Sequence, residues 1–295
     1  MPSENRRVRE AITAKDLKGF KYFKTLQSLL EGLHDVGTAR DIAGNRQLFF
    51  DQYVTLLLLY FFNPVVNTLR GIQQASDLAK VQKTLGVKRT SLGSLNEAST
   101  VFDPAPLRAI VQELAGRAIV LGEKQKSSDL QALEGLTAVD GTLLRALPRM
   151  TWALCCNDHH AAKMHLQFDI LKNVPCDATI TPGDCAGAHH EVEQLRAMLQ
   201  KGRLYVLDRG YGCYPLFRSI LDAKSSFVTR VRDNTAFTLT EERTLDQAAR
   251  AAGVTSDLII GKLGTPHHPD SIKQPLRLVM VDTTSPEDRK STRLN

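Results

Sequence analysis

The spacing of apolar residues predicts a helical first part of the chain. Apolar residues recur three or four positions apart at 23, 26, 29, 30 and 33, and again at 107, 110, 111, 114 and 119, which is typical of amphipathic helices. The run YVTLLLLYFF, residues 53–62, is followed directly by Asn-Pro. It is shorter than the roughly 20 residues that a membrane-spanning helix needs. We therefore expect it to form a buried core helix.

The pattern changes after the polar stretch EKQKSSD, residues 123–129. Residues 136–139 and 204–207 are short apolar runs that predict strands, and residues 163–170 alternate with Met164, Leu166, Phe168 and Ile170 on one face. Helical spacing returns in residues 189–200 and 215–221. Residues 204–231 therefore predict a βαβ unit with Asp208 at the carboxyl end of its first strand, where ligands gather in such sheets.

Residues beyond 232 predict a small β-rich segment. Short strand patterns occur at residues 236–240, 258–262 and 276–281, with a helical interruption near residues 245–252. The first part is thus mainly helical, the second an α/β layer and the third mainly β.

Composition and charge narrow the possible classes of protein only modestly. The chain has 295 residues, 42% of them hydrophobic and 24% charged, with a formal net charge of +6. A basic surplus is compatible with a polyanionic partner. The five cysteines are odd in number and no secretory signal pattern begins the chain, which favours a reduced, cytoplasmic protein. We expect no membrane association.

Two of the predicted strands lead directly into an aspartate. LTAV is followed by Asp140 and Gly141, and LYVL by Asp208, Arg209 and Gly210. If the strands are neighbours, the two carboxylates can share hard cations such as Mg²⁺. Either site alone fits a simple turn better, because Asp accepts local backbone hydrogen bonds and Gly supplies positive φ. Both interpretations stay open on spacing alone.

The segments around the aspartates resemble a known family. LTAVDGTLL and LYVLDRGYGCYPLF, with KMHLQFDI between them and FVTRVRDN after them, resemble the DDE transposases of bacterial insertion sequences, in particular the family numbered four, which has a β-rich insertion. The resemblance covers most of the chain from about residue 51. It implies a ribonuclease-H-like α/β fold, a mixed sheet with flanking helices, preceded by an α-helical domain and followed by a partial β-rich insertion.

The resemblance also implies a function. Asp140 and Asp208 match the first two of three metal-binding, catalytic carboxylates, which together hold two Mg²⁺ or Mn²⁺ ions. The family binds terminal inverted repeats, cuts DNA and joins the freed 3′ hydroxyl to target DNA. The resemblance thus implies DNA as partner, a homodimer on DNA and a nucleoid-associated, bacterial location.

The third carboxylate of the family has no match here. It should be a Glu in a segment Tyr-x-x-Arg-x-x-x-Glu beyond the insertion, and the sequence contains no such segment. We therefore expect a C-terminally truncated and inactive enzyme. Two alternatives are a non-catalytic, DNA-binding remnant that represses transposition, and a stand-alone ribonuclease-H-like nuclease.

The expected organisation has four segments. Residues 1–127 form a helical, DNA-binding region; residues 128–233 form the incomplete catalytic core; residues 234–287 form the partial insertion. The last eight residues, DRKSTRLN at 288–295, resemble one reading frame of a sequencing-library adapter and are expected to be a non-native tail.

Basic and aromatic residues near these elements are candidates for DNA contacts. Arginines pair with phosphates, and a tyrosine can stack near a strand end. Residues 77–99 have the outline of a helix-turn-helix, which adds two basic residues, although ordinary helical packing explains this outline better. The candidate DNA-binding residues are Arg209, Tyr211, Arg230, Arg232, Lys163, Lys88 and Arg89.

Overall fold

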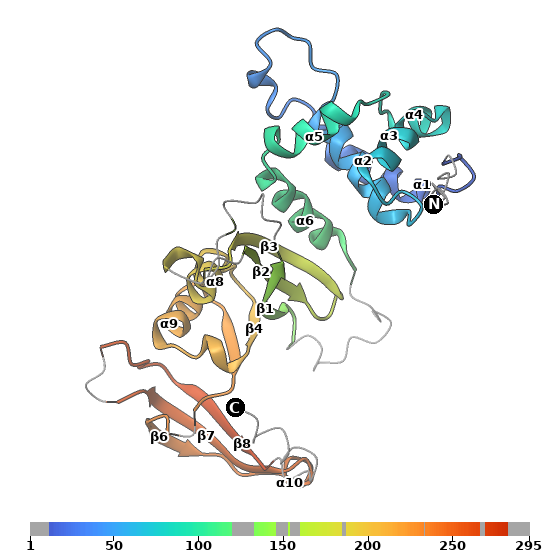
Figure 1. Ribbon diagram of the computed structural model, residues 1–295. Helices are drawn as coiled ribbons and strands as arrows, with labels where there is room; N and C mark the ends of the chain where they lie inside the picture. Colours follow the sequence, from blue (N-terminus) through green and yellow to red (C-terminus); the bar gives the residue numbers. More distant parts are fainter. Residues whose placement is uncertain are drawn as a thin grey trace, which may run out of the picture. The chain divides into compact units, whose positions relative to one another are not determined.

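The chain forms two compact units, Met1–Glu113 and Leu114–Asn295. The computed structural model describes residues 12–119, 133–145, 153, 160–184, 187–232, 234–265 and 269–282 (Figure 1). The polar stretch 123–129 and the expected tail 288–295 lie outside the described residues. The two units are taken in turn.

Unit 1 is built from helices. Its described elements are α1 Phe20–Leu30, η1 Glu31–Leu33, η2 Thr38–Arg40, α2 Phe50–Phe62, α3 Leu69–Ser76, α4 Ala79–Leu85, α5 Leu92–Val101 and the first part of α6 Ala105–Arg117. Leu56 and Leu59 of α2 are fully buried, which confirms a core helix over the apolar run. Its last turn differs, because Phe61 is 73% exposed.

The connection between α4 and α5 has the predicted helix-glycine-helix form. Gly86 ends α4 with a φ of 66°, a left-handed conformation that favours glycine. The Ser91 hydroxyl accepts a hydrogen bond from the Ser94 N–H at 3.0 Å and caps α5. The sequence outline thus predicted the local structure correctly.

Unit 2 contains a mixed five-stranded sheet with the order β3-β2-β1-β4-β5. Its strands are β1 Leu136–Arg145, β2 Ala161–Asp169, β3 Val174–Pro182, β4 Leu204–Leu207 and β5 Ser226–Thr229. The first three pair antiparallel, whereas β4 pairs parallel with both β1 and β5. Helices flank this sheet, which confirms the predicted mixed α/β, ribonuclease-H-like class.

Two helices cover one face of this sheet (Figure 1). They are α8 Glu191–Ala197 and α9 Tyr214–Asp222, with the short η3 Gly187–His189 before α8 and η4 Arg209–Tyr211 after β4. Tyr205 of β4 and Leu216 of α9 are fully buried between the layers. Phe217 of α9 stacks on Phe227 of β5 with ring centroids 4.4 Å apart. The predicted βαβ unit is confirmed.

The orientation of β2 is opposite to the one that its alternating pattern suggests. Lys163, His165 and Gln167 are between 1% and 7% exposed and lie on the helix-covered face. The apolar Ile180 of β3, on the other face, is 56% exposed. The alternating pattern of β2 therefore does not place its apolar face in the core. The cause is tertiary, because α8 covers the polar side of this strand.

A second sheet follows, with the order β6-β7-β8. Its strands are β6 Phe237–Glu242, β7 Val254–Leu263 and β8 Leu276–Val281, with α10 Gln247–Ala251 before β7. Leu258 and Ile260 of β7 belong to the same buried cluster as Leu216 and Phe217 of α9. The β-rich segment predicted beyond residue 232 therefore packs on the α/β sheet and shares its core.

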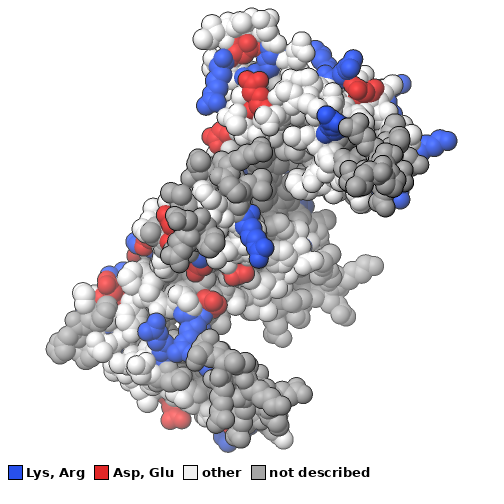
Figure 2. Space-filling view, viewed as in Figure 1, with Lys and Arg blue, Asp and Glu red and all other residues white. Residues whose placement is uncertain are grey.

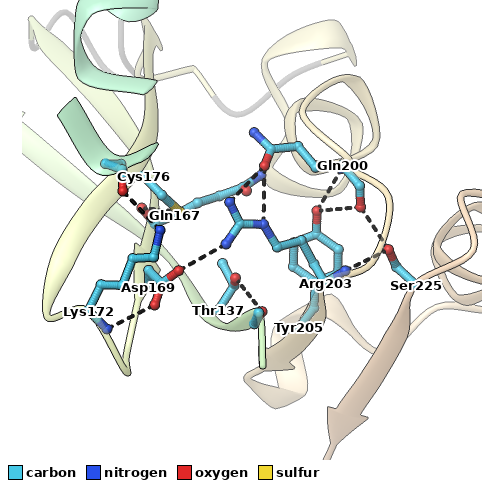
Figure 3. Close-up of polar contacts among 11 residues, drawn as sticks. Thr137, Gln167, Asp169, Lys172, Cys176, Gln200, Arg203, Tyr205 and Ser225 are labelled. Carbon is cyan, nitrogen blue, oxygen red and sulfur yellow. Dashed lines mark hydrogen bonds and ion pairs between the residues drawn. The ribbon is translucent and has the colours of Figure 1, made fainter. Parts of the chain in front are cut away.

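A polar network fixes the amino-terminal ends of β1 and β4 (Figure 3). The Arg203 Nη1 donates to Asp169 Oδ2 at 3.0 Å, and two further Arg203 nitrogens donate to Gln200 Oε1 at 3.1 and 3.0 Å. The Tyr205 hydroxyl accepts from the Gln200 N–H at 2.8 Å, and Ser225 donates to the Gln200 carbonyl at 2.7 Å. The network ties the end of β2 to the start of β4.

Removing Arg203 tests this network. Asp169 is 4% exposed, so Arg203→Ala leaves a buried carboxylate without its cation and should lower the free energy of unfolding by about 3 kcal/mol. Arg196→Ala is the matched control, because the Arg196–Glu193 pair is on the surface and should contribute less than about 1 kcal/mol. Chemical denaturation measures both. Equal effects of the two substitutions would contradict a structural role of the Arg203 network.

Candidate active site

Asp140 and Asp208 follow the paired part of two neighbouring parallel strands. The register pairs Leu136 with Leu204 and Ala138 with Val206; Asp140 lies two residues beyond Ala138, and Asp208 lies two residues beyond Val206, directly after β4. Extending the register and the alternation of side chains by these two residues brings the two carboxylates to neighbouring positions on one face of the sheet. Both residues are exposed, so neither incurs the cost of a buried charge.

The two aspartates differ in their local structure. Asp208 caps η4, and its Oδ1 accepts from the Gly210 N–H at 2.8 Å, as in an ordinary turn. Asp140 lies inside β1, which continues to Arg145. Its Oδ1 accepts from the Gly141 N–H at 2.8 Å, but Gly141 is in the strand. The Asp-Gly turn interpretation is therefore wrong for Asp140.

A buried ion pair explains the glycine after Asp140. Lys163 of β2 forms an ion pair with Glu191, the first residue of α8. A Cβ added at Gly141 would lie 2.6 Å from Glu191 Oε1 and 3.0 Å from Lys163 Cε. The glycine thus leaves room for the ion pair directly beside Asp140. Glu191 was missed by sequence reasoning, because an acidic residue in the first turn of a helix has an ordinary explanation.

Lys163 is paired with Glu191 in this structure, and its side chain is 9% exposed. A DNA contact at this residue stays a prediction. Its partner Glu191 holds the amino end of α8 against β2.

Tyr211 is buried close to Asp140, Asp208 and Glu191, and the negative charges of all three act on its hydroxyl group. It is 3% exposed, so the predicted stacking of its ring on DNA is not supported. Burial raises the pKa of Tyr211, and the negative charges of Glu191, Asp140 and Asp208 raise it further. Tyr211 therefore stays neutral and provides a packed floor under the carboxylate pair.

His165 and Gln167 complete the polar layer under α8. His165 Nε2 is 2.9 Å from Thr181 Oγ1, and the Gln167 Nε2 donates to the Met198 carbonyl at 3.1 Å. Within the described part of the chain, His165 Nδ1 and Gln167 Oε1 are buried without a hydrogen-bond partner. Burial lowers the pKa of His165, and the positive charge of Lys163 lowers it further.

Three of the candidate arginines line one hollow beside Asp208. Arg209, Arg230 and Arg232 border a cavity of about 420 Å³ at the start of α9 and next to the three-stranded sheet. Figure 2 shows Lys and Arg side chains gathered in this part of unit 2. Arg230 and Arg232 follow β5, which ends at Thr229, and both border the hollow.

Lys88 and Arg89 lie in the connection between α4 and α5 of unit 1 and are exposed. Arg89 Nε is 3.0 Å from Asp77 Oδ1 in a surface ion pair. The exposed positions of α5, such as Asn96 and Glu97, include no basic residue. Lys88 and Arg89 thus remain candidates for phosphate contacts only.

The carboxylate pair fits part of a divalent metal site. Carboxylate oxygens are the ligands that Mg²⁺ prefers, together with water. Among the described residues, no group of three or more His, Cys, Asp or Glu side chains is arranged to hold a metal ion. Asp140 and Asp208 therefore supply two donors of the right chemistry, and a complete site needs a further group.

Comparison with known proteins identifies the family. The model described as a transposase DDE domain matches residues 131–287. The chain belongs to this transposase family. A cryo-EM structure of a piggyBac transposase synaptic complex with hairpin DNA is similar to this chain. The sequence identity is 11%, the TM-score is 0.36, and the match covers 90% of this chain. The chain spans 62% of the length of that transposase. The curated proteins contain no match.

The matched region includes both aspartates, the hollow and the three-stranded sheet of the DDE domain. Unit 1 lies before it. None of the helices described for this chain has the length and apolar character that crossing a membrane requires.

Substituting Gly141 tests the packing behind Asp140. Gly141→Ala forces its Cβ against the Lys163–Glu191 pair and should lower the free energy of unfolding by about 1–3 kcal/mol. Gly116→Ala is the matched control, because Gly116 is in α6 with nothing within 4 Å of an added Cβ, and alanine there should be neutral or slightly stabilising. Chemical denaturation distinguishes the two. A Gly141→Ala variant as stable as Gly116→Ala would contradict this packing.

The pKa of His165 predicts a loss of stability at mildly acidic pH. Because the folded chain holds this pKa below the ordinary value of 6.5, the unfolded state binds the proton more readily. The stability that the neutral ring contributes is complete above about pH 6.5 and is lost as the pH falls toward the folded pKa. His165→Gln should therefore flatten the decline of Tm between pH 7 and pH 5, measured by thermal melting. Equal declines in both proteins would rule this out.

Proposed function

We propose that this chain is part of an insertion-sequence transposase of the bacterial family numbered four. It would bind terminal inverted repeats and take part in metal-dependent DNA cleavage and strand transfer. The observation that carries the proposal is the parallel pairing of β1 with β4, which places Asp140 and Asp208 each two residues beyond the last paired residues Ala138 and Val206, inside the region that matches the transposase DDE domain.

Asp140 and Asp208 would hold the divalent ions, Mg²⁺ or Mn²⁺. Such ions activate the attacking oxygen and stabilise the leaving oxygen of an in-line phosphoryl transfer. The residues of the chain orient the donors: each carboxylate has one oxygen fixed by a backbone N–H. The neutral, buried Tyr211 and the Lys163–Glu191 pair keep the strand ends in place.

Arg209, Arg230 and Arg232 would bind the DNA backbone beside the carboxylates. Guanidinium groups pair with phosphate oxygens through two parallel hydrogen bonds, and such contacts position a duplex without reading its sequence. Their shared hollow next to Asp208 supports this role. Lys88 and Arg89 would add phosphate contacts from unit 1.

The open face of the sheet supports the expectation of a further element. Leu144, Ile180 and Val228 are 38%, 56% and 56% exposed and lie on the face that carries Asp140 and Asp208. We infer that a helix bearing the third carboxylate of the family covers this face in the intact transposase. Two carboxylates alone cannot hold both ions in a productive geometry, so the present chain would bind DNA without completing cleavage.

We also propose how the chain is divided into segments and how the transposase assembles. Residues 1–127 would be the DNA-binding region, residues 128–233 the catalytic core and residues 234–287 the partial insertion. The transposase would act as a homodimer on DNA in the bacterial nucleoid.

Strand cleavage by the full-length gene product tests the function. On DNA carrying the element's inverted repeat, with Mg²⁺ or Mn²⁺, Asp140→Asn and Asp208→Asn should each lower the cleavage rate about 100-fold or more, because the metal donors are lost. Asp222→Asn, at an exposed position of α9, is the matched control and should cleave normally.

Two other outcomes would contradict the proposed function. Full cleavage by both aspartate variants would refute the assignment. Equal cleavage of DNA with and without the inverted repeat would indicate a stand-alone nuclease instead of a transposase.

A further inference from the structure

Unit 1 exposes three aromatic side chains, two of them stacked on each other and the third next to them in the sequence of α2, which is unusual for residues of this size. Tyr22 of α1 is 52% exposed, and Phe61 and Phe62 at the end of α2 are 73% and 46% exposed. Tyr22 and Phe62 stack with their ring centroids 6.1 Å apart. We call Tyr22, Phe61 and Phe62 the aromatic surface.

The aromatic surface is held by a rigid clamp between α1 and α2. Asn63 is 1% exposed; its Oδ1 accepts from the Lys18 N–H at 2.6 Å, and its Nδ2 donates to the Leu59 carbonyl at 2.8 Å. Phe62 also packs edge-on against the buried Phe23 at 5.9 Å. The stacked Tyr22–Phe62 pair is therefore held in place, and because Asn63 fixes the end of α2, the exposure of Phe61 and Phe62 is not the result of a frayed helix end.

The sequence segments that carry the aromatic surface contain basic residues and no acidic ones. Residues 18–28 and 61–74 contain Lys18, Lys21, Lys24 and Arg70 and no acidic residue. The Lys21 Nζ lies 4.9 Å from the Tyr22 ring centroid. A surface of flat rings flanked by cations matches bases and phosphates of a nucleic acid.

A second copy of the chain fits this surface less well. In a symmetric dimer each surface faces its own copy, so the lysines of one chain would oppose the lysines of the other. Base stacking requires an exposed base face, which a single strand offers and an intact duplex does not.

We propose that the aromatic surface binds single-stranded DNA, with bases stacked on Phe61 and its neighbours and phosphates held by Lys18 and Lys21. This goes beyond the proposed transposase function, because it assigns unit 1 a ligand other than duplex inverted repeats. It depends on neither the carboxylates nor a metal ion.

Binding of short fluorescein-labelled oligo(dT) to the whole chain, in EDTA and followed by fluorescence anisotropy, tests the proposal. Phe61→Ala should weaken binding about 5-fold or more, as expected for the loss of one stacked base. Phe61→Leu, which keeps an apolar side chain without the ring, should weaken it similarly, whereas Phe61→Trp should retain it. Ile42→Ala is the matched control, because Ile42 is an apolar residue of unit 1 that is 98% exposed.

A duplex of the same length and analytical ultracentrifugation separate the alternatives. The Phe61 variants should leave duplex binding unchanged, and the chain should keep its sedimentation coefficient. Unchanged oligo(dT) binding by Phe61→Ala would overturn the proposal, as would an equal loss of duplex binding. Conversion of a dimer to a monomer by Phe61→Ala would show that a second copy is the occupant. Because the assay needs no cleavage, its failure would leave the proposed catalytic role untouched.

Discussion

The parallel pairing of β1 with β4 is the interaction on which the candidate site depends. Its register, continued two residues beyond Ala138 and Val206, brings Asp140 and Asp208 to neighbouring positions, and a shift of one residue would move one carboxylate to the helix-covered face. The Arg203 network fixes this register from the other end of the strands, by joining Asp169 of β2 to the turn before β4. Chemistry at one end of the sheet thus depends on polar contacts at the opposite end.

At β2 the two faces of the sheet differ from the usual arrangement of an apolar covered face and a polar open face. The helix-covered face contains Lys163, His165 and Gln167, whereas apolar Ile180 and Val228 are more than half exposed on the face that carries the aspartates. A buried ion pair contributes little net stability, but it fixes the start of α8 beside Gly141. Because the polar layer lies on the helix-covered side of the sheet, it supports the backbone of β1 there. The carboxylates of Asp140 and Asp208 remain in contact with water on the other side.

Much of the architecture could be predicted from sequence, because apolar spacing decides which segments become helices and strands. The βαβ unit around Asp208 and the helices of unit 1 followed from that spacing. The buried face of β2 could not, because it depends on which side α8 packs. The same is true of β3, where prolines at both 175 and 182 obscure the strand, and of Glu191, whose partner lies on a distant strand. The sequence resemblance predicted Asp140 as a metal ligand, but its position near Asp208 follows only from the register of β1 and β4.

Helix α2 shows how one segment can serve two purposes. Its middle residues, Leu56 and Leu59, are fully buried, yet Phe61 two positions later is among the most exposed apolar residues of the chain. Continuous hydrophobicity predicts burial throughout, because periodicity cannot tell a core position from a binding surface in an unbroken apolar run. The distinction arises from Asn63, which ends the helix and ties it to α1. The aromatic rings beyond the core are then left facing solvent, where stacking is the interaction that remains open to them.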